Sequence, residues 1–197
     1  MSYRGFSIVV FLVVLLLSLS KVAVSQSEEQ TINADSLMLV KNLDESFRKS
    51  IYYKGFNPIA IISPIDDFKN SGVVAASAFC QINPGKKYET VFIINSVHKA
   101  NFDGFSIDIK DSISTLLGKV DLNEDLAIKM VENSEICDYY KPVHNSDTLS
   151  SDLIHFLQFY LEQSFSVLPI LVGRPSTHSS KELASLLRPF LNDNNLF

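Results

Sequence analysis

The chain has 197 residues, of which 46% are hydrophobic and 20% charged, and its formal net charge is -5. A chain of this length and composition can bury one sizeable core, so a single folded domain is expected. The acidic balance and the lack of a basic cluster argue against nucleic acid as a partner. Seven glycines and seven prolines are too few for a low-complexity architecture. Cys80 and Cys137 alone do not make a disulfide framework in a chain this long.

The first 25 residues predict export. Arg4 gives a short basic start, and the apolar run from Phe6 to Leu19 is followed by the small residues Ala23-Val24-Ser25. The run is shorter than the roughly 20 residues of a membrane-spanning helix. We therefore expect cleavage before Gln26 and a secreted, periplasmic or lumenal protein. The alternative is an uncleaved segment that anchors the protein in a membrane, which is the only membrane contact that the sequence predicts.

The rest of the chain divides into a short polar linker at 26–36 and an α/β domain at 37–197. Apolar residues at three- and four-residue spacing predict the first helix over 37–51, with a cap at Asn33 or Asp35. A short β-branched run at 59–62 predicts a fully buried strand. Ser71 is then expected to cap a small-residue helix over 72–81.

The middle of the domain contains a second buried strand at 90–94 and then a change in pattern. Apolar residues alternate with polar ones on both sides of Lys110-Asp111, which predicts a hairpin there. Asn123 is expected to cap a helix that ends near Glu132, and 136–140 is a candidate edge strand.

The C-terminal third predicts a helix, a strand and a helix. Ser146 or Asp147 is expected to cap an amphipathic helix over 149–161, and 165–172 reads as a buried strand. A last helix is expected over 181–191, capped by Ser179 or Ser180. Strands that alternate with helices predict an α/β fold with a mainly parallel or mixed sheet and flanking helices.

His98 is the strongest single candidate for chemistry. It follows the strand at 90–94, and open α/β sheets bind ligands beyond the carboxyl ends of their strands. One imidazole is not a site, because a metal ion needs three or four ligands. His144, Asp147 and the pair Asp66-Asp67 are the residues that the fold would have to bring to it.

Four segments, in this order and spacing, resemble the MEMO family, also called AmmeMemoRadiSam system protein B. They are IISPIDDFKNSGVVAASAF at 61–79, VFIINSVH at 91–98, TLLGKVDLNEDLAIKM at 115–130 and FLQFYLEQSFSVLPILVG at 156–173. The resemblance runs from about Leu37 to the C-terminus. It implies a fold similar to that of the class III non-haem extradiol dioxygenases, with a histidine-lined cleft at the strand ends.

The departures from the family pattern fall on the residues that this resemblance places in the cleft. The first family block has a histidine and a small Ala-Gly pair where this chain has Ile65 and Asp66-Asp67. His98 matches the second histidine. The last family block, a strand with further site residues, lies beyond Phe197, so the resemblance implies a shortened domain.

The third family block is altered in the same way. His144 fits its lead-in, and Asp147 replaces its first glutamate. Thr148 stands where the family has a histidine, and Ser151 where it has the second glutamate.

These departures predict a degenerate metal site. His98 and His144 are the candidate metal ligands, no catalytic residue is assigned, and iron, copper or zinc is expected only if the site is retained. The expected function is an exported, non-catalytic binding or scaffold protein for a protein, peptide or small ligand. The alternative is a metal-dependent redox or hydrolytic enzyme, using non-haem iron or copper held by His98 and His144. The missing strand is expected to leave an unpaired sheet edge beside Leu168–Val172 or Ile93.

Overall fold

The computed structural model describes residues 34–64, 66–97, 102–147 and 149–197. It divides the chain into two compact units, Met1–Val40 and Lys41–Phe197, and the second contains the sheet. The predicted signal peptide and most of the linker lie outside the described residues. No helix within those ranges is long and apolar enough to cross a membrane.

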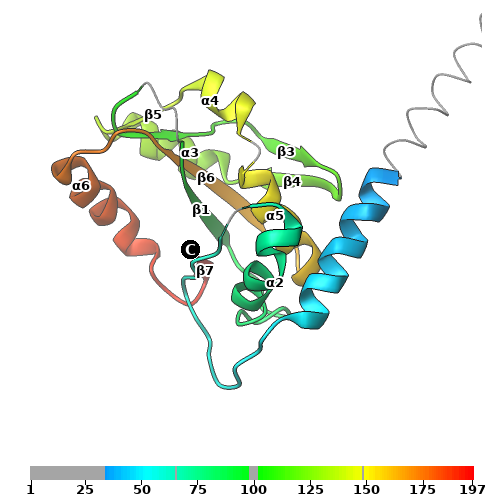
Figure 1. Cartoon of the computed structure of the whole chain (residues 1–197). Coiled ribbons are helices and arrows are strands. Elements are labelled where there is room, and N and C mark those ends of the chain that lie inside the picture. Colours follow the sequence, from blue (N-terminus) through cyan, green and yellow to red (C-terminus); the bar gives the residue numbers. More distant parts are fainter. Residues whose placement is uncertain (1–33, 65, 98–101, 148) are drawn as a thin grey trace, which may run out of the picture. The chain divides into compact units, whose positions relative to one another are not determined.

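In the described part of the chain, seven strands form one mixed, mostly parallel sheet, as predicted (Figure 1). They are β1 (Thr90–Ser96), β2 (Phe105–Ile107), β3 (Ser112–Thr115), β4 (Gly118–Leu122), β5 (Cys137–Asp138), β6 (Ser166–Val172) and β7 (Asn195–Leu196). The main order is β3-β4-β6-β1-β7, and β2 pairs with both β5 and β6. The pairs β3–β4 and β2–β6 are antiparallel, and the others are parallel.

The central strand β6 explains how a proline is tolerated inside the sheet. One edge of β6 pairs with β1 along its length, and the other edge pairs first with β4 and then with β2. The carbonyl of Val167 accepts the N–H of Asn123 and that of Val172 accepts the N–H of Val97, so odd-numbered residues of β6 face β4 and β2. Pro169 therefore faces the gap between the residues that pair with β4 and those that pair with β2. The N–H that proline lacks would have no strand partner there, so no sheet hydrogen bond is lost.

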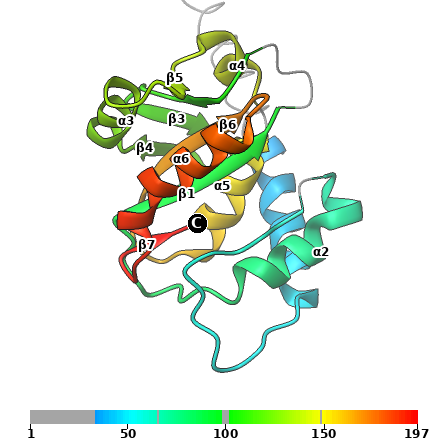
Figure 2. The ribbon, with the colours of Figure 1, turned by 90° about the vertical axis from the view of Figure 1, so that its left-hand side faces the viewer.

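Helices cover both faces of this sheet (Figures 1 and 2). They are α2 (Phe68–Phe79), α3 (Glu124–Glu132), α4 (Lys141–Ser146), α5 (Leu149–Tyr160) and α6 (Thr177–Leu187), with a 3-10 turn at Arg188–Phe190. On one side, α3 and α6 pack on β1, β2 and β6 through a core that includes Met130, Leu183 and Leu187. On the other side, α2 and α5 meet through stacked rings of Phe79 and Phe156.

The expectation of a buried strand at 59–62 is wrong. This segment is extended but forms no assigned strand, and the side chain of Ile62 is 98% exposed. The strand that pairs with β1 at Thr90 and Val91 is β7. The segment instead lies along β7, where the Phe197 N–H donates to the Ile59 carbonyl at 2.9 Å and the Ile61 N–H to the Phe197 carbonyl at 2.7 Å.

The expected hairpin around Lys110-Asp111 is also wrong. The hairpin joins β3 to β4 through Leu116-Leu117, and Gly118 follows with a φ of 117°. The alternation of apolar residues identified the strands but not their partners, because β2 pairs with distant β5 and β6 instead of its neighbour in sequence.

Several helix starts differ from those expected. The cap of α2 is Asp67 and not Ser71, and α6 is capped by Ser176, whose hydroxyl accepts the Ser179 N–H at 3.0 Å. The short helix α4 was not predicted. The predicted caps at Asn123 and Asp147 are confirmed, because each accepts a backbone N–H from the first turn of its helix.

Candidate functional site

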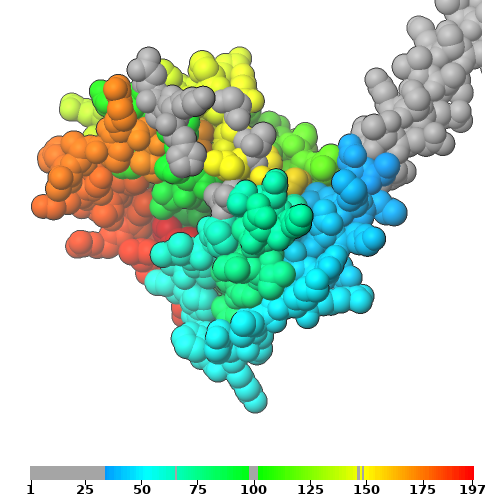
Figure 3. All heavy atoms as spheres, viewed as in Figure 1, coloured from blue at the N-terminus to red at the C-terminus, as the bar shows by residue number. Residues whose placement is uncertain are grey.

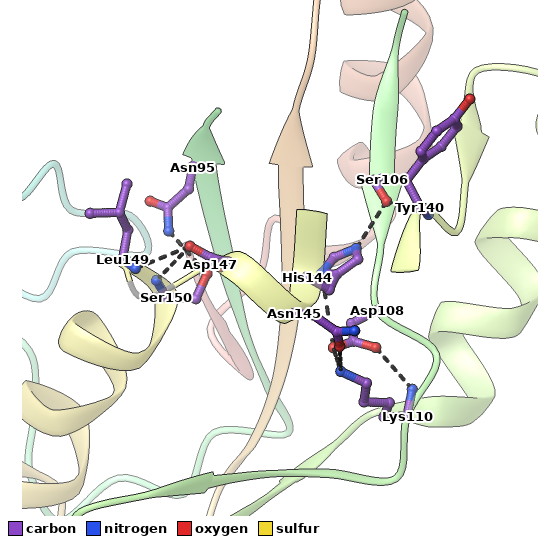
Figure 4. Close-up of polar contacts among 10 residues, drawn as sticks. All are labelled: Asn95, Ser106, Asp108, Lys110, Tyr140, His144, Asn145, Asp147, Leu149 and Ser150. Atoms are coloured by element: carbon purple, nitrogen blue, oxygen red, sulfur yellow. Dashed lines mark hydrogen bonds and ion pairs between the residues drawn. The ribbon is translucent and has the colours of Figure 1, made fainter. Parts of the chain in front are cut away.

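A buried polar cluster lies where β2 and α4 meet (Figure 4). Ser106 is the middle residue of β2, and Asp108 follows the strand directly. His144 comes from α4, which begins after β5, the parallel neighbour of β2. The pairing of β2 with β5 therefore brings these three side chains together across 38 residues of sequence.

His144 is held by hydrogen bonds inside the protein. Its side chain is 2% exposed, and its Nε2 lies 2.9 Å from the Oγ of Ser106. That hydroxyl also accepts the backbone N–H of Tyr140 at 2.8 Å. A serine hydroxyl has one donor, so the arrangement favours donation from Ser106 to an unprotonated Nε2. The proton of the neutral ring then sits on Nδ1, which faces the Asp108 carboxylate at 3.9 Å.

Asp108 is a buried carboxylate with a nearby cation. Its Oδ2 lies 3.5 Å from the Nζ of Lys110, and its Oδ1 accepts the Lys110 backbone N–H at 3.2 Å. Lys110 also donates to the side-chain oxygen of Asn145 on α4 at 3.3 Å. The lysine thus compensates the buried charge and ties the loop after β2 to α4.

The charge state of His144 follows from this environment. Burial lowers the pKa of the imidazole below its usual value, and the charge of Lys110 acts in the same direction. The carboxylates of Asp108 and Asp147 oppose the shift without reversing it. His144 is therefore neutral at neutral pH, and its free lone pair is the one that accepts from Ser106.

A second group of bonds connects the cluster to the end of β1. The Oδ1 of Asp147 accepts the N–H of Leu149 and of Ser150, which caps α5. Ser150 Oγ in turn accepts the side-chain amide of Asn95 at 3.0 Å, with both groups buried. Asn95 lies near the end of β1, three residues before His98, which is outside the described residues.

A polar hollow of about 260 Å³ opens beside this cluster. Its walls combine charged, amide and hydroxyl groups from the loop after β2, from β3, from the end of α4 and from the start of α5. They include Asp108, Lys110, Ser112, His144, Asn145, Asp147, Ser150 and Ser151. A small polar ligand or a polar side chain of a partner suits this lining better than an apolar molecule.

The pair Asp66-Asp67 lies elsewhere. The carboxylate of Asp66 accepts the Asp67 N–H at 2.8 Å and the side-chain amide of Asn70 at 3.3 Å, and both aspartates are exposed. Together with Asp152 they line a different hollow, of about 340 Å³. Burial, and the charges of Asp147 and Asp67, raise the pKa of Asp152.

The two remaining histidines have different surroundings. His155 on α5 is buried, and neither ring nitrogen makes a hydrogen bond; the carboxylate of Asp152 is 4.0 Å away. Burial lowers the pKa of His155. His178 on α6 is exposed and lies 3.8 Å from Glu182. Cys80 and Cys137 are both buried, free thiols.

Among the described residues, no group of three His, Cys, Asp or Glu side chains is arranged to hold a metal ion. His144, the predicted ligand that is described, has Nε2 occupied by Ser106 and Nδ1 directed at Asp108. Ile65 and Thr148, the positions at which the resemblance implies family histidines, lie outside the described residues.

In space, His144 lies between Ser106 and Asp108, as the base of a catalytic triad lies between its nucleophile and its acid. Ser106 is 0% exposed, so a substrate carbonyl cannot reach its hydroxyl. The contact between His144 and Asp108 is also longer than a hydrogen bond. The trio is therefore a structural network that joins β2 to α4.

Sequence reasoning missed Ser106 and Asp108. Ser106 lies in β2 and Asp108 directly after it, so the two polar residues alternate with apolar ones, a pattern that normally marks a solvent-facing side. Only the contact with α4, a helix that was itself not predicted, shows that this side is covered.

Comparison with known proteins gives a consistent result. A family profile described as "Memo-like protein" matches residues 30–197. A "MEMO1 family protein" of Methanobrevibacter smithii is 23% identical over 163 residues, 78% of this chain and 57% of the relative. A protein of the same name from Sulfolobus acidocaldarius is 25% identical over 162 residues, 77% of this chain and 57% of the relative. The chain thus spans about half the length of the relatives that it matches.

Proposed function

Because the chain belongs to the Memo-like protein family, we propose that it is an exported, non-catalytic binding domain whose metal site has degenerated. The observation that carries this proposal is the state of His144. A metal ligand must offer a free nitrogen to the ion, whereas both ring nitrogens of His144 face other protein groups and the ring is buried.

The polar network around His144 supports a scaffold role for the cleft residues. Ser106, Asp108 and Lys110 position α4, and Asp147 and Asn95 position the start of α5. These side chains, which would line the cleft of an active enzyme, instead hold α4 and α5 in place. A fixed, polar hollow of this kind can bind a protein loop, a peptide or a small polar ligand.

Metal analysis of the purified protein tests the proposal against its rival, a metal-dependent redox or hydrolytic enzyme using His98 and His144. The native chain would be produced in medium containing iron, copper and zinc, and the metal bound per chain measured. We expect far less than one ion per chain. His98→Ala and His144→Ala should not change that value, and His178→Ala serves as the exposed-histidine control. Nearly one ion per chain, lost in both His98→Ala and His144→Ala but kept in the control, would support the enzyme.

The export part of the proposal has a separate test. Ala23-Val24-Ser25 precede the expected cleavage point at Gln26. N-terminal sequencing of the mature protein should begin at Gln26. A membrane-bound product that still begins at Met1 would support the anchor instead.

A further inference from the structure

Residues 51–57 form a loop that exposes large, mostly apolar side chains to water. The loop follows the helix that ends at Lys49, and each of its residues is exposed. Four of them are large: the exposed fractions of Ile51, Tyr52, Tyr53 and Phe56 are 57%, 60%, 60% and 67%. In Figures 1 and 3 this cyan segment projects below α2. Loops normally expose small and polar side chains, so a contiguous apolar set of this kind marks an interaction surface.

The backbone at the start of this loop is held in place by α2 and the residues that follow it. The Ile51 N–H donates to the Ser77 hydroxyl at 3.0 Å, and the Tyr53 N–H donates to Oε1 of Gln81 at 3.1 Å. The side-chain amide of Gln81 donates in return to the Ile51 carbonyl at 2.8 Å. The rings of Tyr53 and Phe56 then meet edge to face, with their centroids 6.4 Å apart. The exposed rings are therefore presented by a backbone that is itself hydrogen-bonded to the domain.

A hollow of about 460 Å³ lies between this loop and the turn at 82–88. Tyr52 and Phe56 line it from the loop, and Lys86 lines it from the turn. Tyr160, at the end of α5, also lines it. The loop and the turn therefore form one surface. Because the turn leads into β1, this surface lies at the end of the sheet where that strand begins.

The charge of this surface is opposite in sign to that of the chain. The whole sequence has 17 Lys and Arg residues against 22 Asp and Glu residues, which gives a net charge of -5. The segments 50–58 and 82–88 contain no Asp or Glu, and their basic residues are Lys54, Lys86 and Lys87. Glu89 follows the turn, and the Glu162 N–H donates to the Pro84 carbonyl within it. The three lysines still outnumber these two acids, so the surface attracts anions.

We propose that the loop 51–57 binds the surface of a lipid bilayer that contains anionic headgroups. Phe56 enters the boundary between headgroups and acyl chains, and the phenol groups of the two tyrosines stay at the depth of the headgroups. Lys54 and Lys86 contact lipid phosphate groups. This contact goes beyond the proposed binding function and lies at a place separate from the His144 cluster. It is also distinct from any membrane contact of the N-terminal segment.

The chemistry of the loop selects a bilayer over other partners. A bilayer places apolar chains below polar headgroups, so a tyrosine finds a suitable environment for both its ring and its hydroxyl there. Lysine suits the same depth, because its stem is apolar and its ammonium group faces phosphate. Phenylalanine, tyrosine and lysine in one exposed loop match this gradient of polarity. A projecting loop also reaches a flat surface without any change in the rest of the fold.

A tryptophan placed in the loop tests the proposal, since the chain has no tryptophan of its own. The Phe56→Trp variant of the full chain would be mixed with vesicles of phosphatidylcholine and phosphatidylserine whose acyl chains carry bromine. We expect a blue shift of its emission and quenching by about threefold or more. Leu116→Trp, at another exposed apolar position in a turn, is the matched control and should show neither effect. Binding through the N-terminal segment would act on both variants alike.

The role of charge has its own pair of variants, made in the Phe56→Trp chain. Lys54→Glu replaces attraction to phosphate by repulsion, and we expect it to weaken binding to the anionic vesicles about tenfold, measured from the titration of quenching. Lys181→Glu makes the same change of net charge on the exposed side of α6 and should leave binding unchanged. Vesicles of phosphatidylcholine alone should bind the loop roughly fivefold more weakly or less.

Four results would overturn the proposal. The first is emission of Phe56→Trp that saturating vesicles leave unchanged. The second is equal quenching of Phe56→Trp and Leu116→Trp, which would assign the contact to the N-terminal segment. The third is equal binding by the Lys54→Glu and Lys181→Glu variants. The fourth is a blue shift that grows with protein concentration without vesicles, which would assign the loop to contact between copies of the chain. The metal analysis is independent of these outcomes, so either proposal can fail alone.

Discussion

At the scale of single residues, Ser106 supports two buried groups at once. Its hydroxyl satisfies the N–H of Tyr140 and the Nε2 of His144. Ser106→Ala leaves both without a partner in the interior, and we expect it to lower the free energy of unfolding by about 2 kcal/mol. Ser112→Ala is the matched control, because that hydroxyl bonds only to the exposed carboxylate of Asp111. Chemical denaturation of the two variants checks the prediction, and equal stability would contradict it.

His155 gives the opposite expectation. Its ring is buried and neither nitrogen is hydrogen-bonded, so His155→Leu removes an unsatisfied polar group. We expect the free energy of unfolding to rise by about 1 kcal/mol at pH 7. His178→Leu on exposed α6 should change it by less than about 0.5 kcal/mol. A loss of stability in the His155 variant would indicate a hydrogen bond to that ring.

The same variant carries a pH dependence with a defined sign. Burial lowers the pKa of His155 in the folded state, so below the unfolded value of roughly 6.5 the unfolded chain binds the proton more tightly. The free energy of unfolding of the wild type therefore falls as pH falls from 7 to 5. The His155→Leu variant lacks the contribution of His155 to that fall. The advantage of the variant should widen over this range. Asp152 acts in the other direction, because burial raises its pKa, but it is present in both proteins.

The candidate site shows which residue roles a sequence can reveal. Asp147 and Asn123 were predictable caps, because capping depends on a side chain and the next few backbone N–H groups. The role of His144 was not, because it depends on Ser106 and Asp108, which reach it only through the pairing of β2 with β5. The prediction that His98 joins His144 in a metal site stays a prediction, since His98 lies outside the described residues.

At the scale of elements, Gly104 fixes the entry into β2. Its φ is +80°, and a Cβ there would lie 2.6 Å from the carbonyl oxygen of Ile136, just before β5. Gly104→Ala should therefore cost more than about 2 kcal/mol, because strain and a backbone clash add. Gly118→Ala, at a φ of +117° with nothing near its Cβ, should show only the strain. Thermal unfolding of both variants checks this, and equal losses would mean that β2 and β5 are not held this closely.

The elements also show where pattern reading succeeds and fails. The strands at 90–94 and 165–172 and the helix that starts at Glu124 are confirmed, because a long buried run or a good cap is a local signal. The segment 59–62 has the same apolar composition but is extended and exposed. What distinguishes it is β7, which occupies the neighbouring position and comes from the far end of the chain. Local composition does not reveal which distant segments of the chain will pair.

At the scale of the whole molecule, family membership and fold agree, and the proposed function rests on the polar cluster around His144. The chain spans about half the length of its relatives, so their activities do not transfer to it as a whole. The expectation of an unpaired edge is wrong for β6, which has neighbours on both sides. Among the described strands, β7 pairs with β1 at Thr90 and Val91.

The central claim is that His144 is a neutral, buried part of the structure and not a metal ligand. Nitrogen-15 NMR of the imidazole, recorded between pH 5 and 8 with and without zinc, tests this most directly. The account predicts a ring protonated at Nδ1, a pKa below the usual value of an imidazole, and no shift on adding one equivalent of zinc. A His144 ring whose pKa is not lowered and whose signals shift with stoichiometric zinc would contradict it.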